Sequence, residues 1–464
     1  MASKKPEAGF SARSSSRPGV KSNAGSRTES SAESSAVPTG RVGRFARVAK
    51  MAGGVAGGML AEGTRQLRAG NRPRARDLLL TPGNAKRVAD QLADMRGAAM
   101  KMGQILSMDT GDFLPRELAD ILSRLRSDAR SMPHNQLETA MLDAYGDDWK
   151  SLFYNFDYKP LAAASIGQVH RTISPDGRDI VLKIQYPGVA NSIEPDVDNI
   201  ATVLKLSGLL PPTVDIQPLL NDAKKQLRDE VDYLKEAEFL EAFNELLGED
   251  ERFLLPQVLP ELTRKNVLAM TYVAGRPIES LAEESQEEID RVMTALIDLM
   301  LSELFELRMV QTDPNFANYQ YRNTDGKIVL LDFGATRRFK ATFVRNYRKL
   351  AGAAMAGDAE GVVAAAEKVG YAMGDENSEY RAIVLELFLL ALEPLKVDEA
   401  YDFGDSPIAP DMQELGQRVT EFKDFWQAPP TDAVYFHRKL GGMFMLAARL
   451  GARVNVHRLI SRWV

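Results

Sequence analysis

Residues 161–186 read LAAASIGQVHRTISPDGRDIVLKIQY. Two runs rich in β-branched residues flank a turn at Pro175-Asp176-Gly177, so the stretch predicts a β-hairpin. The first strand begins with small residues, and the second carries Lys183 among aliphatic side chains. A lysine in a strand is most often a solvated edge residue. Other motifs are therefore needed before Lys183 is given a role.

Small residues in the hairpin have the spacing of a kinase nucleotide loop. Ala162, Ala164, Gly167 and Val169 fall on the G-x-G-x-x-G-x-V pattern. Lys183 then lies in a V-L-K strand, where kinases place the lysine that contacts the α- and β-phosphates. Alanine adds a Cβ where backbone amides would approach phosphates, and it disfavours positive φ. We therefore expect this loop to hold ATP differently from a glycine-rich loop.

Two further motifs follow in kinase order. Asp313 and Asn318, in VQTDPNFAN, have the D-x-x-x-x-N spacing of a catalytic loop. There the aspartate orients or deprotonates a hydroxyl and the asparagine holds Mg²⁺. The same Thr-Asp-Pro-Asn string is also typical of an Asx turn. The apolar strand VLLDFG then ends in Asp332, a carboxylate suited to Mg²⁺ between the β- and γ-phosphates. Each motif alone is weak, but the three in order predict a Mg-ATP site.

A kinase lysine also needs a glutamate from a nearby helix. Residues 222–247 are predicted to form one long amphipathic helix that carries Glu230, Asp232 and Glu236. On a single helix, Glu230 and Glu236 would face directions about 120° apart. Only one of them could then pair with Lys183, so we expect another cation to meet Glu230.

The composition limits the metal chemistry. The 464 residues include no cysteine and four scattered histidines, so thiolate and histidine-cluster sites are excluded. Carboxylate and amide oxygens remain, and these favour Mg²⁺. The net charge of −6 combines a basic leader with an acidic remainder, which suggests an anionic partner for the leader. Few aromatic residues are available there for base stacking, so we expect no nucleic acid.

The first part of the chain has the composition of a leader and a surface segment. Residues 1–40 are rich in Ser, Ala, Gly and Arg and are predicted to be disordered. Residues 41–64 join a basic run to a glycine-rich apolar stretch, Met51–Ala61, that is shorter than the about 20 residues of a membrane span. Two overlapping G-x-x-x-G spacings would allow close helix pairing. We expect either a helix lying on an anionic membrane surface, with possible homodimerisation through it, or a flexible linker.

The order of elements predicts an α+β fold. Residues 85–107 have helical periodicity, strands dominate in 158–186 and 253–273, and helices dominate from Glu284 onward, except for a hairpin around Asn323–Gly326. We expect a bilobal protein-kinase-like fold with an N-terminal helical extension and a mainly helical C-lobe. The expected parts are the disordered leader (1–40), the helical extension (41–150), the kinase-like N-lobe (151–275), and the C-lobe with catalytic loop and DFG (276–464).

Four short motifs give the chain a specific resemblance. Over roughly residues 41–464 it resembles the UbiB family of atypical kinases, a ubiquinone-biosynthesis group. The motifs are K-x-G-Q at Lys101-Met102-Gly103-Gln104, the alanine-rich loop Ala162-Ala163-Ala164-Ser165, E-x-D at Glu230-Val231-Asp232, and Gln311-Thr312-Asp313-Pro314-Asn315 in place of His-Arg-Asp.

The resemblance implies roles for these residues. Glu236 would be the helix partner of Lys183. Lys101 and Gln104 would lie over the active site, with Lys101 near Glu230 or, as second choice, Asp232. Family members bind and hydrolyse ATP and support ubiquinone production at a membrane. Many carry a transmembrane segment, which is missing from the pattern of this sequence, so we expect peripheral attachment.

Together these observations predict an ATPase or a small-molecule or lipid-linked kinase that uses ATP and Mg²⁺. Only ATRRFKATF separates DFG from the next helices, so the peptide-binding surface of a protein kinase is largely missing. The expected partners are a quinone-precursor lipid or an anionic membrane surface. The expected location is cytoplasmic at a membrane periphery, or the matrix side of the mitochondrial inner membrane. The alternatives are a protein kinase and a non-catalytic scaffold that binds nucleotide.

Overall fold

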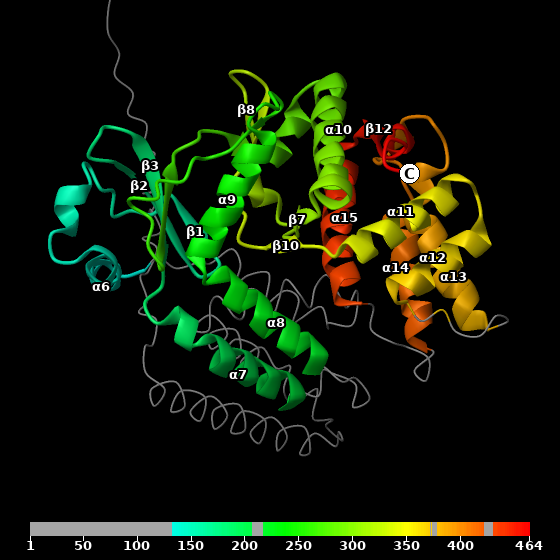
Figure 1. Cartoon of the computed structure of the whole chain (residues 1–464), viewed down its shortest axis with the longest axis horizontal. Helices are drawn as coiled ribbons and strands as arrows, with labels where there is room; N and C mark the ends of the chain where they lie inside the picture. The colour runs from blue at the N-terminus through cyan, green and yellow to red at the C-terminus, as the bar shows by residue number, and fades with distance from the viewer. Residues whose placement is uncertain (1–131, 207–216, 372, 374–377, 422–429) are drawn as a thin grey trace, which may run out of the picture. The chain divides into compact units, whose positions relative to one another are not determined.

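The computed structural model describes residues 132–206, 217–371, 373, 378–421 and 430–464, labelled as in Figure 1. The leader, the glycine-rich segment 41–64 and the motif Lys101–Gln104 lie outside these residues. Among the helices that the structure does describe, every one is too short or too polar to cross a bilayer.

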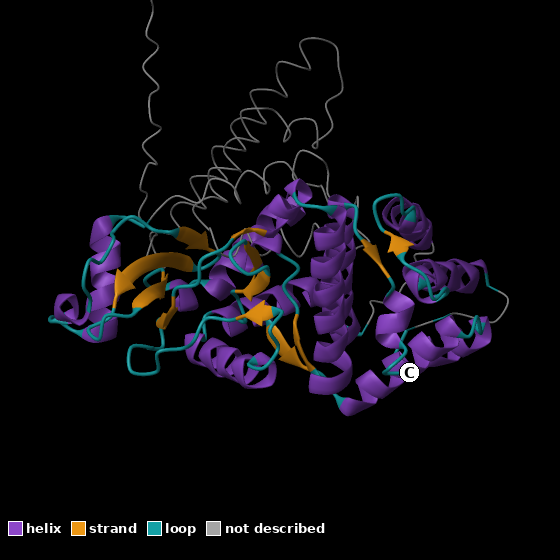
Figure 2. Ribbon diagram, turned by 90° about the horizontal axis from the view of Figure 1, so that it is seen from above, coloured by secondary structure: helices purple, strands orange, loops and turns teal. Residues whose placement is uncertain are grey.

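An antiparallel sheet forms the small lobe, with strand order β1-β2-β3-β5; its strands are among those drawn in orange in Figure 2. The predicted hairpin is β2–β3, paired from Gly167–Gln185 to Ile173–Asp179. Gly177 in its turn has φ 86°, which glycine adopts without a Cβ clash. The elements of this lobe are α6 (His134–Tyr145), β1 (Ala162–Ala164), β2 (Gly167–Ile173), β3 (Asp179–Gln185), α7 (Ile193–Leu206), α8 (Gln217–Glu230), α9 (Tyr233–Leu247) and β5 (Val267–Thr271).

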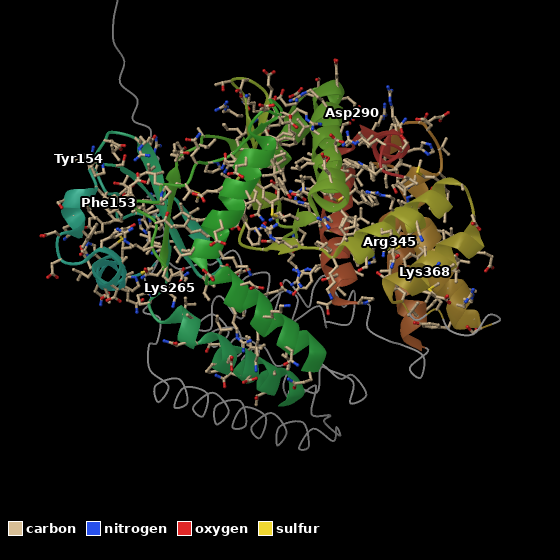
Figure 3. The ribbon with its side chains drawn as sticks, viewed as in Figure 1. Phe153, Tyr154, Lys265, Asp290, Arg345 and Lys368 are labelled. Atoms are coloured by element: carbon tan, nitrogen blue, oxygen red, sulfur yellow. The ribbon has the colours of Figure 1, made fainter. Side chains whose placement is uncertain are left out.

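Helix α6 and the segment after it share an apolar core with this sheet. Leu137 and Met141 of α6 are buried in one cluster with Ile180 and Leu182 of β3. Phe153, labelled in Figure 3, belongs to the same cluster, and its ring lies 5.3 Å from that of Tyr145. Burying each of these large apolar side chains contributes about 1.5–3 kcal/mol. This core holds β3, and therefore Lys183, in a rigid setting.

The prediction of a single helix over 222–247 is wrong. The structure has two helices, α8 and α9, separated at Val231 and Asp232. The Asp232 carboxylate accepts a hydrogen bond from the Lys235 N–H (3.2 Å) and caps α9, a contribution of about 1 kcal/mol. The Val231 carbonyl accepts from Gln185 Nε2 (2.7 Å) instead of from a helical N–H. The angle derived for Glu230 and Glu236 on one straight helix therefore does not apply.

The large lobe is mainly helical, with short strands that carry the motifs. The predicted hairpin is β8–β9, and these strands lie in a sheet of order β4-β9-β8-β6. Helices α10 and α15 contact each other in this lobe (Figure 1). The remaining elements are β4 (Phe253–Leu254), β6 (Arg276–Pro277), α10 (Gln286–Ser302), β7 (Met309–Gln311), β8 (Tyr319–Arg322), β9 (Lys327–Leu330), β10 (Thr336–Arg338), α11 (Ala341–Met355), α12 (Ala359–Val369), α13 (Glu379–Ala391), β11 (Tyr401–Asp402), α14 (Ile408–Glu421), α15 (Thr431–Leu450), β12 (Arg453–Val454) and α16 (Val456–Ile460).

A histidine of α15 lies between two tyrosines in the core of this lobe. The hydroxyls of Tyr347 and Tyr371 are both within hydrogen-bonding distance of the His437 ring, and the Tyr371 ring stacks on it. Burial lowers the pKa of His437 to about 4. The imidazole is therefore neutral in the folded protein at pH 7.

Candidate active site

Lys183 meets two carboxylates that come from different parts of the chain. Its Nζ donates to Glu236 Oε1 (2.7 Å) on α9 and to Asp332 Oδ2 (3.0 Å), two residues after β9. The side chains of Lys183 and Glu236 are 9% and 3% exposed, whereas that of Asp332 is 34% exposed. The structure thus brings together the predicted lysine, its predicted helix partner and the DFG aspartate.

The electrostatics of this cluster follow from burial and charge. Burial by itself lowers the pKa of the Lys183 ammonium, but Asp332 and Glu236 outweigh it and raise the pKa well above the ordinary value. Lys183 is therefore charged at neutral pH. Burial raises the pKa of Glu236 to about 7, against the attraction of Lys183. An ammonium held between two carboxylates in a dry setting is suited to contact a phosphate oxygen.

Packing fixes helix α9 against the sheet and against the DFG segment. The Tyr233 ring centroid lies 5.3 Å from Lys183 Nζ, and the ring is fully buried. On the next turns of α9, Phe243 contacts Phe333 of DFG, with ring centroids 4.7 Å apart. The Gly334 N–H donates to Asp332 Oδ1 (3.0 Å). The carboxylate that follows β9 is thus held by its own turn as well as by Lys183.

The predicted catalytic loop lies directly beside the DFG segment. Strands β7 and β10 pair at Gln311 and Thr336, and Thr312 Oγ1 donates to the Ala335 carbonyl (2.7 Å). Asp313 follows and is half-buried, with its Oδ1 accepting from the Asn315 N–H (3.4 Å). The Asx-turn interpretation of this string therefore also holds. The turn places Asp313 next to the DFG segment.

Asn318 is placed so that it can act with Asp332. Its carbonyl accepts from the Leu331 N–H (3.0 Å), one residue before Asp332. Asn318 is buried, and its Nδ2 makes no hydrogen bond within the part of the chain that the structure describes. The amide oxygen of Asn318, beside the Asp332 carboxylate, is of the ligand type that fits a Mg²⁺ ion completed by phosphate oxygens. Anywhere among the described residues, no group of three or more His, Asp or Glu side chains is placed to hold a metal.

The alanine-rich loop is a tight turn between β1 and β2. Ala162 pairs with Val169 and Ala164 with Gly167, which leaves Ser165 and Ile166 at the turn. A Cβ on Gly167 would lie 2.1 Å from the Ile184 carbonyl oxygen. This glycine is thus required by the close approach of β3. Ala162 and Ala163 are exposed, and Val169 pairs across the strands with Lys183.

Glu230 and Asp232 contact groups that sequence reasoning did not identify. Ser165 Oγ donates to Glu230 Oε2 (2.8 Å), which joins the alanine-rich loop to the end of α8. Asp232 serves as the cap of α9. The contact predicted between Lys101 and Glu230 involves a residue outside the described ones, as does any role of Gln104, and both stay predictions.

The chain after DFG leaves little space for a peptide-binding segment. Strand β10 follows Gly334 after one residue, and helix α11 begins at Ala341. The short connection expected from the sequence is therefore present. Sequence reasoning missed Lys439 of α15, which is buried behind the catalytic loop. No spacing in the sequence marks it, because its partners are brought to it only by the fold.

Several known proteins are similar to this chain in sequence and in fold. A family model, the ABC1 atypical kinase-like domain, matches residues 124–366. The chain is 37% identical to the mitochondrial atypical kinase COQ8 of Saccharomyces cerevisiae over 433 residues, which is 92% of this chain and 86% of that one. It is 35% identical to the mitochondrial atypical kinase COQ8B of Rattus norvegicus, over 92% of this chain and 80% of that one.

A solved structure gives the same result for the fold. The structure of the Rv3197–erythromycin complex from Mycobacterium tuberculosis covers 82% of this chain and 96% of its own, with TM-score 0.56 and 23% identity. The predicted kinase-like fold and the predicted family resemblance are both confirmed. The chain belongs to the ABC1, or UbiB, family of atypical kinases.

Proposed function

We propose that this atypical kinase binds Mg-ATP and transfers the γ-phosphoryl group to water or to a small-molecule or lipid hydroxyl. The observation that carries the proposal is the position of Lys183 Nζ between Glu236 (2.7 Å) and Asp332 (3.0 Å), beside the loop with Asp313 and Asn318. This set supplies the charges and ligands that phosphoryl transfer needs.

Each group has a separate role in the proposal. Lys183 contacts the α- and β-phosphates, and Glu236 keeps its ammonium in place. Asp332 and Asn318 would hold Mg²⁺, and the metal would supply positive charge to the phosphates. Asp313 orients the attacking hydroxyl or water and accepts its proton as the new P–O bond forms and ADP leaves. Of the alanine-rich loop, residues 162–165 with Gly167 and Val169 line the nucleotide.

The acceptor is proposed to be something other than a protein. Only the six residues ATRRFK (335–340) lie between DFG and helix α11, which is too short a stretch for laying out a peptide. Family membership supports a role in ubiquinone synthesis, with a quinone-precursor lipid or an anionic membrane surface as partner. The names of the relatives place them in mitochondria. We propose peripheral attachment to a membrane, at the cytoplasmic face or the mitochondrial matrix face.

The test is Mg-dependent ATP turnover by the purified full chain, with and without anionic liposomes. Asp313→Asn should lower turnover by at least about 100-fold, since loss of one well-placed proton acceptor costs about 10²–10⁴-fold. Asp325→Asn is the matched control, because Asp325 lies in the β8–β9 turn, where the structure describes its contacts to the neighbouring Arg322 and to the Lys327 N–H. Turnover that Asp313→Asn leaves intact would refute the assignment.

The same experiment separates the alternatives. Labelled phosphate on an added protein would identify a protein kinase. Saturable nucleotide binding without any turnover would identify a scaffold.

A further inference from the structure

A buried lysine of helix α15 lies behind the catalytic loop. Lys439 is 1% exposed. Its Nζ donates to the Tyr319 hydroxyl (2.6 Å) and to Gln311 Oε1 (3.4 Å). Glu303, also buried, is the counter-charge, with Oε2 3.4 Å from Nζ. The hydrogen bonds of this ammonium thus go to two residues of the loop region, and the carboxylate balances its charge.

The two hydrogen-bond acceptors flank the proposed catalytic residues. Gln311 is the last residue of β7, two positions before Asp313, and Tyr319 is the first residue of β8, directly after Asn318. A single ammonium therefore holds both ends of the segment 312–318. Ordinary stabilisation of the lobe would not require that both bonds go to these two residues.

The same face of α15 also contacts the bend of the loop. Gly442 is three residues after Lys439, so the two share a helix face. A Cβ on Gly442 would lie 2.6 Å from Pro314 Cβ and 3.1 Å from its Cα. The helix thus approaches the loop backbone too closely for any side chain. Three points of the loop, its two ends and its bend, are fixed by one helix more than a hundred residues further along the chain.

The charge state suits this role. Burial alone lowers the pKa of the Lys439 ammonium, but Glu303 and Tyr319 outweigh it and hold the pKa above the ordinary value. A charged donor gives stronger hydrogen bonds than a neutral one. Lys439 therefore restrains the loop more firmly than an amide or hydroxyl in its place would.

We infer that Lys439 is a positioning residue for phosphoryl transfer: its ammonium sets the distance of Asp313 and Asn318 from Lys183 and Asp332. It touches neither nucleotide nor metal, and acts through Gln311 and Tyr319. This inference rests on the proposed function for its kinetic consequence. A loop displaced by about 1 Å costs about 100-fold in rate.

The test compares Lys439→Met with Arg438→Met. Arg438 is the adjacent residue, also buried, and its Nη1 bonds to Gln226 on α8 and not to the loop. Lys439→Met should lower kcat about tenfold or more and change the Kd for Mg-ADP by a smaller factor, because Lys183 and Asp332 are untouched and only Asn318 among the proposed nucleotide and metal contacts is displaced. Arg438→Met should lose stability but keep kcat. Equal loss of kcat in both variants would overturn the inference.

Two further variants isolate the path of the effect. Tyr319→Phe removes one of the two acceptors of Lys439. If Lys439 acts through Tyr319, the fold-loss of kcat in the double variant Lys439→Met/Tyr319→Phe should be smaller than the product of the losses in the two single variants. Lys439→Met leaves Glu303 buried without its cation, so Lys439→Met/Glu303→Gln is measured as well, and it should fold with the same low kcat. Wild-type kcat in that folded variant would refute the inference.

Amide hydrogen exchange separates this inference from the proposed function. In Lys439→Met, amides of residues 312–319 should exchange at least about tenfold faster than in wild type, with residues 180–184 of β3 unchanged. This readout needs no turnover. If the wild-type chain does not hydrolyse ATP, the proposed function fails while exchange still decides whether Lys439 holds the loop. Unchanged exchange at 312–319 would refute it.

Discussion

Substitution of the two carboxylates that contact Lys183 should affect folding stability and nucleotide binding to different extents. Glu236→Gln removes a partner that is 3% exposed, whereas Asp332→Asn removes one that is 34% exposed. Breaking a buried ion pair costs about 3–5 kcal/mol. Lys183 keeps Asp332 in the first variant, so we expect the lower end, about 3 kcal/mol. Solvent partly screens the Lys183–Asp332 pair, so Asp332→Asn should cost less, about 1 kcal/mol.

Bound Mg-nucleotide should reverse the order of stability of the two variants. A ligand at 100 times its Kd stabilises the folded chain by about 2.7 kcal/mol. Asp332→Asn removes the charged Mg²⁺ ligand, and a 100-fold loss of affinity would leave about 0.4 kcal/mol of that stabilisation. Glu236→Gln retains both proposed metal ligands, Asp332 and Asn318, and should keep most of it.

The assay is urea unfolding of the wild type and both variants, with and without Mg-ADP. The reasoning predicts that Glu236→Gln is the less stable variant without nucleotide and the more strongly stabilised one with it. If Asp332→Asn is stabilised by Mg-ADP as much as the wild type, the metal assignment is wrong. If both variants lose the same stability without nucleotide, the difference in burial does not control the energetics of this cluster.

Three further predictions concern the extension, the leader and the core. Lys101→Ala should loosen the extension, seen as faster proteolysis there, and Ala162→Gly should raise autophosphorylation; an unchanged level of labelled phosphate in Ala162→Gly contradicts the role given to alanine. Deleting residues 41–64 should reduce sedimentation with anionic liposomes and leave nucleotide binding intact, since each basic residue near such a surface contributes about 1 kcal/mol. High salt should mimic the deletion, and equal sedimentation of both chains would exclude this segment. The folded-state pKa of His437, about 4, is below the ordinary value of about 6.5, so the unfolded chain binds the proton first and stability falls as pH drops below 6.5, by up to about 2 kcal/mol at pH 5. His437→Gln should lose less stability between pH 7.5 and 5 in urea unfolding, and a slope equal to that of the wild type would contradict this origin.

Local patterns predicted the parts of the fold that depend on neighbouring residues. The hairpins β2–β3 and β8–β9 carry Gly177 and Gly326 at positive φ in their turns. Such turns can be predicted from a sequence, because glycine is strongly preferred at these positions. The motif order and the spacing from Asp313 to Asp332 also predicted that these residues and Lys183 belong to one site, and the family resemblance implied that Glu236 pairs with Lys183. For Asp332 and Glu236 the contacts are observed, while the chemical roles remain proposals.

Features that depend on distant parts of the chain were not predictable. The periodicity of residues 222–247 continues through Val231 and Asp232, so nothing periodic marks the break between α8 and α9. The break is stabilised by Gln185 of β3, which bonds to the Val231 carbonyl. Lys439 reads as an ordinary lysine of an amphipathic helix. Its partners Glu303, Gln311 and Tyr319 lie more than a hundred residues earlier, and only the packing of α15 brings them together.

The difference in burial between the two carboxylates suggests how nucleotide enters the cluster. Asp332 Oδ2 is already in contact with Lys183, so a metal that takes this oxygen would weaken its hydrogen bond to the ammonium. Glu236 is buried and held on α9, and it can keep Lys183 while the ammonium turns toward a phosphate. The exposed carboxylate is then the exchangeable partner and the buried one is the fixed partner.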